Sequence, residues 1–197
     1  MKIVITKSLT RLETEKTQRN LEFISLFTQV AKDFGMRAIV HGGYSVDGAL
    51  GKITKPHKDV DIQVYGNQSD AESTLSNIFK LIKSEKFDYE NIKWKDKGRS
   101  TFYHNFLAIK GTFCADFYYI QVTGNPFDKN KIIIKDDGKE NEIQEYRTHK
   151  VTLTGVSFEA TLPEDELDDK KSKNEKEGKL RADIDQDILN LESLLQK

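Results

Sequence analysis

The residues best suited to do chemistry lie between positions 41 and 64. A short apolar segment ends in Gly42 and Gly43, and the chain later reaches Asp59 and Asp61, which stand one residue apart. The two acids alternate with apolar residues, namely Val60, Ile62 and Val64. This period of two is typical of a strand with one buried face. The two carboxylates are therefore expected on the same side of one strand.

These residue types favour a phosphate site beside a cation site. Glycines lack a Cβ atom, so their backbone N–H groups can approach a phosphate closely. A helix that starts directly after Gly43 would add unpaired N–H groups and the positive end of its dipole. The carboxylates of Asp59 and Asp61 would repel each other as anions. A hard divalent cation such as Mg²⁺ relieves that repulsion and leaves room for substrate phosphates.

Each half of this pattern also has a purely structural explanation. A pair of glycines is commonly a turn, and two aspartates in alternation are commonly the solvated face of a strand. Neither explanation predicts that the glycines, a helix start and the acidic strand follow one another. We therefore keep the phosphate and cation interpretation as a hypothesis.

The longer string from Gly42 to Asp61 resembles the aminoglycoside and lincosamide nucleotidyltransferases, which are small members of the polymerase-β-like nucleotidyltransferase superfamily. The superfamily signature is a Gly-Gly or Gly-Ser pair followed by Asp-x-Asp or Asp-x-Glu on a strand. Further positions match the family at its own offsets, namely Asp47, Gly51, Thr54, Lys55 and His57. The run 114–118 fits the family's later acidic strand. The resemblance covers residues 20–195 and is strongest over 41–64.

The resemblance implies an enzyme that transfers a nucleoside monophosphate, AMP, from a nucleoside triphosphate such as ATP to a hydroxyl of a small molecule, and releases pyrophosphate. It makes Asp59, Asp61 and Asp116 the catalytic residues and the ligands of two Mg²⁺ ions, with Asp116 also taking the proton of the hydroxyl. It assigns the nucleotide to Gly42, Gly43, Ser45, Lys52, Lys55 and His57. For His57, fixing the turn before Asp59 is an equal alternative, and Asp47 is interpreted as a partner of Lys55 or of a nearby N–H group.

The rest of the sequence predicts the elements that position these residues. Apolar spacing predicts a helix over 17–34 that ends at Gly35, a strand over 37–41, a short helix over 44–50 and a strand over 59–65. Ser69 and Glu72 form the capping box of a helix that runs to Lys83. Strand-like runs follow at 101–109, 112–122, 131–134 and 150–153, and 93–99 is expected to be a solvated loop.

The C-terminal part changes in composition. Pro163 is expected in the first turn of a helix, and 13 of the 18 residues from 164 to 181 are charged, which is typical of a solvated helix or connector. A last apolar stripe, Ile184, Ile188, Leu191 and Leu195, predicts a closing helix. We expect an α/β (α+β) nucleotidyltransferase fold with a mixed β-sheet flanked by helices. Residues 1–162 form the nucleotidyltransferase domain, and 163–197 form a helical segment that packs on it.

Composition narrows the function classes. The 31 basic and 32 acidic residues leave a net charge of −1, which argues against nucleic acid as a partner. No apolar run is long enough to span a membrane, and no secretory signal is evident. A single cysteine excludes an internal disulfide. We expect a cytoplasmic protein whose partners are a nucleoside triphosphate and a small-molecule acceptor.

The acceptor is the least determined part of the hypothesis. An aminoglycoside or lincosamide antibiotic is the acceptor that the resemblance implies, which would connect the protein to antibiotic resistance. A polycationic acceptor would need carboxylates beside the metal site, and the candidates are Glu159, Glu164, Asp165 and Glu166, which also suit a helix N-terminus. The alternatives are an enzyme of the same fold that modifies tRNA or a protein, as in toxin systems, and a non-catalytic nucleotide-binding module.

Overall fold

The structure is a computed structural model. It describes residues 11–67, 71–83, 89–96, 102–109, 113–128, 131–136, 139–144, 147–177 and 182–196. The helices in these ranges are α1 (Arg11–Asp33), α2 (Gly43–Leu50), α3 (Ala71–Ile82), α4 (Pro163–Glu177) and α5 (Ala182–Leu195). The strands are β1 (Arg37–His41), β2 (Asp59–Gly66), β3 (Tyr89–Asp96), β4 (Phe102–Ile109), β5 (Phe113–Thr123), β6 (Lys131–Asp136), β7 (Lys139–Gln144), β8 (Thr148–Leu153) and β9 (Val156–Thr161).

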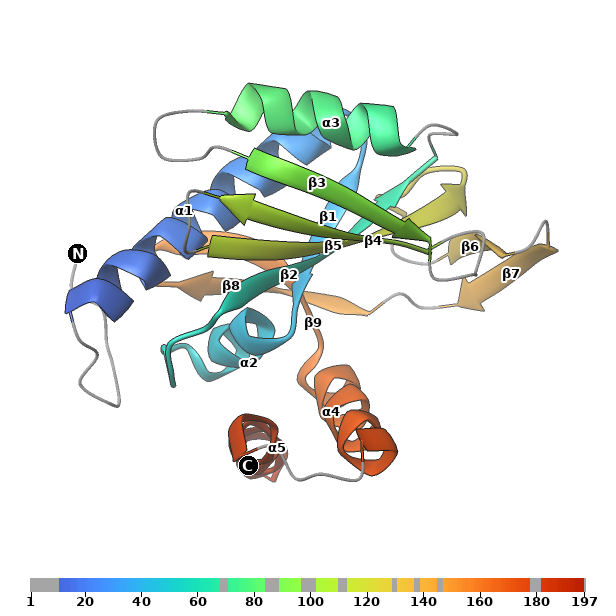
Figure 1. The fold of residues 1–197 in the computed structure, drawn as a ribbon. Coiled ribbons are helices and arrows are strands. Elements are labelled where there is room, and N and C mark those ends of the chain that lie inside the picture. The colour runs from blue at the N-terminus through green and yellow to red at the C-terminus, as the bar shows by residue number, and fades with distance from the viewer. Residues whose placement is uncertain are drawn as a thin grey trace.

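The strands form one mixed sheet in the order β3-β4-β5-β2-β1-β9-β8, and β6 and β7 extend from the end of β5 (Figure 1). The pairs β2·β5 and β1·β9 are parallel, whereas the other strand pairs are antiparallel. Both parallel pairs lie at the centre, so β1, β2 and β5 are neighbours there. The mixed sheet flanked by helices confirms the expected fold class.

An aromatic core covers one face of the sheet. The stripe predicted from apolar spacing on α1 buries Leu21, Ile24 and Phe27 completely. The ring of Phe27 lies 4.7 Å from the ring of Phe117 on β5 and 6.1 Å from the ring of Phe79 on α3, measured between centroids. These contacts join α1, α3 and the sheet into one core, to which β2 contributes the apolar face of its alternating sequence.

Helices α2, α4 and α5 form a second group, and Figure 1 shows α4 and α5 on the side of the sheet opposite to α3. Helix α2 packs against both α4 and α5 as well as against β1 and β8. A Cβ atom on Gly48 of α2 would come within 2.8 Å of the side chain of Val151 on β8, so α2 lies close against the sheet. Asn174 of α4 donates a hydrogen bond to Asp185 of α5 at 2.8 Å, which ties the two C-terminal helices together.

Most of the predicted elements are present, with corrections at the less regular segments. Helix α1 begins at Arg11, earlier than expected, because the residues before 17 continue the helix with polar side chains. Residues 93–96 belong to the edge strand β3, although their charge suggested a loop. Strands β7 and β9 were also not predicted, since charged and hydroxyl residues interrupt their apolar pattern. Ser69 lies outside the described residues, so the capping box remains a prediction.

The described helices include none that has both the length and the apolar character needed to cross a lipid bilayer.

The aromatic core generates a stability prediction. Phe27→Ala removes a fully buried ring that contacts three other aromatic rings. We expect it to lower the free energy of unfolding by about 3–5 kcal/mol in urea titrations. The exposed Leu189 on α5 serves as the control, and Leu189→Ala should change that free energy by less than about 0.5 kcal/mol. Equal effects of the two substitutions would contradict the assignment of Phe27 to the core.

Candidate functional site

The glycine turn between β1 and α2 requires glycine at both positions. Gly42 has a φ angle of 70°, which side chains disfavour, and a Cβ atom on it would overlap with the carboxylate of Asp61. A Cβ atom on Gly43 would overlap with the imidazole of His57. The turn therefore lies directly against the acidic strand on one side and against the following loop on the other. The N-terminus of α2 begins at the same turn.

The three predicted carboxylates share one face of the sheet at the end of β1. In the parallel pair β2·β5, Asp61 is directly opposite Asp116 and Asp59 is opposite Cys114. Neighbouring strands are about 4.8 Å apart and side chains alternate along each strand, so the side chains of Asp59, Asp61 and Asp116 point the same way. Asp116 therefore faces the same side of the sheet as Asp59 and Asp61.

The closeness of the three carboxyl groups changes the pKa of Asp61. Burial and the neighbouring charges of Asp59 and Asp116 raise the pKa of Asp61 from 3.8 to about 7, and Glu166 adds to the effect while Lys173 opposes it. Asp116 is 8% exposed and Asp61 is half-buried. An ionised carboxylate in this group is costly without a cation beside it.

A divalent metal fits these residues chemically. The donors are all carboxylate oxygens, which Mg²⁺ prefers, and the glycine turn lies so close to the Asp61 carboxylate that a Cβ atom on Gly42 would overlap with it. Within the part of the chain that the structure describes, no three histidine, cysteine or acidic side chains are arranged to hold an ion as they stand. The three aspartates share a face and an end of the sheet.

Glu166 of α4 is one of the four acids that the sequence suggested beside the metal site, and it reaches the site through a contact with Gly42 that the sequence did not indicate. Its side chain is 2% exposed, and its Oε1 accepts a hydrogen bond of 2.8 Å from the backbone N–H of Gly42. Its Oε2 is buried and has no hydrogen-bond partner among the described residues. Burial raises the pKa of Glu166 to about 7, against the lowering effect of Lys170 and of the Gly42 N–H group. A carboxyl group thus already accepts a hydrogen bond from the glycine turn.

His41 and Tyr118 lie on the same face of the sheet as the three aspartates. His41 is paired in register with Asp61, and its ring lies 5.2 Å from the ring of Tyr118, measured between centroids. Burial and the charge of Lys173 lower the pKa of His41 to about 3, so the imidazole is neutral at pH 7. Burial and the charge of Asp61 raise the pKa of Tyr118, so its hydroxyl stays protonated. Both side chains can offer hydrogen bonds to a ligand without adding charge.

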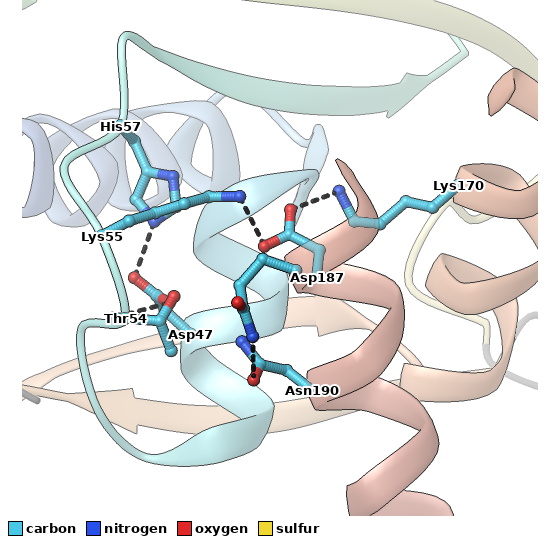
Figure 2. Close-up of polar contacts among 8 residues, drawn as sticks. Asp47, Thr54, Lys55, His57, Lys170, Asp187 and Asn190 are labelled. Atoms are coloured by element: carbon cyan, nitrogen blue, oxygen red, sulfur yellow. Dashed lines mark hydrogen bonds and ion pairs between the residues drawn. The ribbon is translucent and has the colours of Figure 1, made fainter. Parts of the chain in front are cut away.

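The loop between α2 and β2 is organised around Asp47, which is fully buried (Figure 2). Asp47 Oδ1 accepts hydrogen bonds from the backbone N–H of Thr54 at 3.0 Å and from its hydroxyl at 2.5 Å. Its Oδ2 lies 2.7 Å from Nε2 of His57, whose ring packs 4.6 Å from the ring of Tyr44, measured between centroids. These contacts favour the structural alternative for His57, which is to fix the turn before Asp59.

Lys55, in the same loop, is paired with the C-terminal helix. Its Nζ donates to Oδ1 of Asp187 at 2.6 Å, and the Nζ of Lys170 on α4 lies 3.0 Å from Oδ2 of the same carboxylate (Figure 2). The expected partner of Asp47 is therefore a nearby N–H group, that of Thr54, whereas Lys55 finds its partner 132 residues away.

Two other predicted nucleotide residues, Ser45 and Lys52, make their observed contacts with other parts of the chain. The Ser45 side chain is 1% exposed and donates a hydrogen bond of 3.0 Å to the carbonyl oxygen of Thr161, so its hydroxyl is turned toward β9. Lys52 follows the end of α2 and is half-buried, and its backbone N–H donates to the carbonyl oxygen of Asp47. The structure thus brings Gly42 and Gly43 next to Asp61 and Asp116, whereas it shows no contact of Ser45 or Lys52 with these aspartates.

The four acids suggested for a cationic acceptor do not form one cluster. Glu159 is paired with the buried Arg37, whose Nε lies 2.9 Å from Glu159 Oε2. Glu164 and Asp165 are exposed on the first turn of α4, where Asp165 lies 3.6 Å from Arg147. Glu166 alone reaches the glycine turn. The three acids on α4 separate because adjacent residues of a helix point in different directions, and Glu159 lies on strand β9.

Comparisons with known proteins found one family model and several similar solved structures. A family model described as aminoglycoside-2''-adenylyltransferase matches residues 24–177. The lincosamide antibiotic adenylyltransferase LnuA, solved with lincomycin bound, is similar with a TM-score of 0.56 and 15% identity over 95% of this chain and 99% of that one. ANT(2'')-Ia, solved in complex with adenylyl-2''-tobramycin, is similar with a TM-score of 0.58 and 13% identity over 91% of this chain and 90% of that one. At these identities the two structures show a shared fold. No curated protein sequence matched.

The crowded carboxylates predict how stability depends on pH without metal. The pKa of Asp61 is raised to about 7 in the folded chain, above its ordinary value of 3.8, so the folded chain holds the proton more tightly. The contribution of Asp61 to the free energy of unfolding should therefore fall as pH rises from about 4 to about 7. Above about pH 7 the carboxylate is ionised in the folded chain as well, and its contribution falls no further. In EDTA at pH 8, Asp61→Asn should therefore raise the melting temperature, and this gain should shrink toward pH 4.

The matched control for this experiment is Asp33→Asn, which removes an exposed carboxylate at the end of α1. It should leave the melting temperature nearly unchanged at both pH values. A melting temperature of Asp61→Asn that falls well below that of the control at pH 8 would mean that Asp61 is needed to hold the fold, and would contradict the charge-repulsion account.

Proposed function

Because the chain belongs to the aminoglycoside-2''-adenylyltransferase family, we propose that it transfers AMP from ATP to a hydroxyl group of an aminoglycoside or lincosamide antibiotic. The protein is a nucleotidyltransferase, as its family is. The observation that carries the finer proposal is the register of β2 and β5, which sets Asp61 beside Asp116 next to the glycine turn.

We assign the triphosphate to the glycine turn. The backbone N–H groups at Gly42 and Gly43 and the N-terminus of α2 are the donors that suit phosphate oxygens. Glu166 now accepts the N–H of Gly42, so a phosphate at this position would replace its carboxylate. Lys52 and Lys55 lie in the loop that follows α2 and would offset charge on the leaving pyrophosphate.

Asp59, Asp61 and Asp116 would hold two Mg²⁺ ions. When bound, the ions offset the negative charge that builds up on the phosphates and on the attacking and leaving oxygens. The three carboxylates are already oriented to one side by strands of a continuous sheet, so little reorganisation of the backbone is needed.

Asp116 takes the proton of the acceptor in this proposal. The acceptor hydroxyl oxygen forms a bond to the α-phosphorus, the bond between that phosphorus and the bridging oxygen to the β-phosphorus breaks, and pyrophosphate leaves. The hydroxyl proton passes to the Asp116 carboxylate. The neutral His41 and Tyr118 lie on the same face and suit the binding of hydroxyl groups.

The acceptor class rests on the family and on the charge of the site. LnuA and ANT(2'')-Ia are solved with lincomycin and with an adenylylated tobramycin. Glu166 and the aspartates of β2 and β5 gather four carboxyl groups at this end of the sheet, which suits an acceptor with amino groups.

A transfer assay tests the proposal. With ATP labelled at the α-phosphate, the protein should transfer label to a kanamycin-class or a lincosamide-class compound when Mg²⁺ is present, and EDTA should abolish the transfer. Asp116→Asn should reduce the rate by at least about 100-fold, since it removes the base and a metal ligand. Asp33→Asn, which changes an exposed acid, should keep the wild-type rate.

Two negative results have different meanings. A protein that binds a non-hydrolysable ATP analogue with Mg²⁺ and labels neither antibiotic class would contradict the acceptor assignment. A protein that binds no ATP analogue and labels no acceptor would contradict nucleotidyl transfer by this site as a whole.

A further inference from the structure

The carboxylate of Asp187 joins three separate parts of the chain. It lies on α5, its side chain is 4% exposed, and it receives Lys55 from the loop after α2 and Lys170 from α4 (Figure 2). A buried carboxylate is tolerated when such partners compensate for its lost hydration. The Asp187 carboxylate therefore fixes the place of both lysine side chains.

Two lysines of the cluster share one carboxylate. The Nζ of Lys55 lies at Oδ1 of Asp187, and the Nζ of Lys170 lies at Oδ2. The side chains of Lys55 and Lys170 are 22% and 9% exposed, so water screens their charges only partly. Two ammonium groups held this close together suit an anion that carries several negative charges, such as a nucleoside triphosphate.

The cluster is adjacent to the glycine turn on both sides. Lys170 follows Glu166 by four residues and so lies on the same side of α4, and its charge acts on the Glu166 carboxylate that holds the Gly42 N–H. Lys55 is two residues from His57, whose ring lies against Gly43. Both lysines are therefore next to the residues to which we assign the triphosphate.

We propose that Asp187 is a positioning residue that holds Lys55 and Lys170 together as a cationic pair for the β- and γ-phosphates of the nucleotide. This inference rests on the proposed function and adds two residues, Lys170 and Asp187, to the nucleotide site. The carboxylate keeps the two ammonium groups from repelling each other, and it keeps two long side chains ordered before the nucleotide arrives. The C-terminal helix α5 is thereby part of the nucleotide site.

The proposal is tested by comparing the affinities for two nucleotides that differ in the number of their phosphates. Asp187→Asn preserves the size of the side chain but removes the charge that holds both lysines. We expect it to weaken the binding of a non-hydrolysable ATP analogue by at least about tenfold, measured by isothermal titration calorimetry with Mg²⁺. The affinity for AMP, which has no β- or γ-phosphate, should stay within about twofold of wild type.

Asp185→Asn is the matched control. Asp185 lies on the same helix and also joins α5 to α4, through its hydrogen bond with Asn174, but it contacts no lysine of the cluster. This variant should change neither affinity. A role of Asp187 that is limited to holding α4 and α5 together would make the two variants behave alike.

Lys170→Met provides a second route if Asp187→Asn does not fold. It removes one positive charge and leaves the bond between Lys55 and Asp187 in place. We expect it too to weaken the ATP analogue and to leave AMP unchanged. The inference is overturned if the folded variants keep the wild-type ratio of the two affinities. If the wild-type protein itself binds no ATP analogue, the proposed function fails first.

Discussion

Repulsion among carboxylates at one end of the sheet is the constraint on which the rest of the structure depends. The parallel register of β2 and β5 holds Asp61 beside Asp116, and α4 adds Glu166 on top of them. Because the register of the strands is fixed, the carboxyl groups cannot move apart, and a cation between them would relieve their repulsion. The glycine turn meets the same constraint from the other side, because only a residue without Cβ fits against Asp61. In the proposed function, metal binding and phosphate binding therefore depend on the same contact between the glycine turn and Asp61.

The C-terminal helices contribute both acidic and basic side chains to this region of the structure. Their sequence is so rich in Lys and Glu that a solvated segment was the natural expectation. Among the described residues of α4 and α5, three charged side chains are nevertheless buried, those of Glu166, Lys170 and Asp187. Each makes a contact with the glycine turn, with the loop after α2 or with another of the three. Burial of such groups is favourable only when they are paired, so their pairing also fixes where α4 and α5 lie.

The parts of the site that could be predicted are those encoded locally. Gly42 and Gly43, the alternation around Asp59 and Asp61, and the closing stripe of α5 all follow from the spacing of nearby residues. The contacts of Glu166 with Gly42 and of Asp187 with Lys55 join residues 124 and 132 positions apart, and no local period marks them. Strand β9 escaped prediction for a related reason, since its burial comes from β1 and α1 and its own sequence is mixed.

The central claim is that the three aspartates form a metal site beside the glycine turn. The most direct measurement is a crystal structure with a non-hydrolysable ATP analogue and Mn²⁺, which takes the same oxygen ligands as Mg²⁺ and is located by its anomalous scattering. We predict Mn²⁺ between the phosphates and the carboxylates of Asp59, Asp61 and Asp116, with the triphosphate against Gly42 and Gly43. Mn²⁺ bound to the triphosphate alone, with none of the three carboxylates as a ligand, would contradict the account.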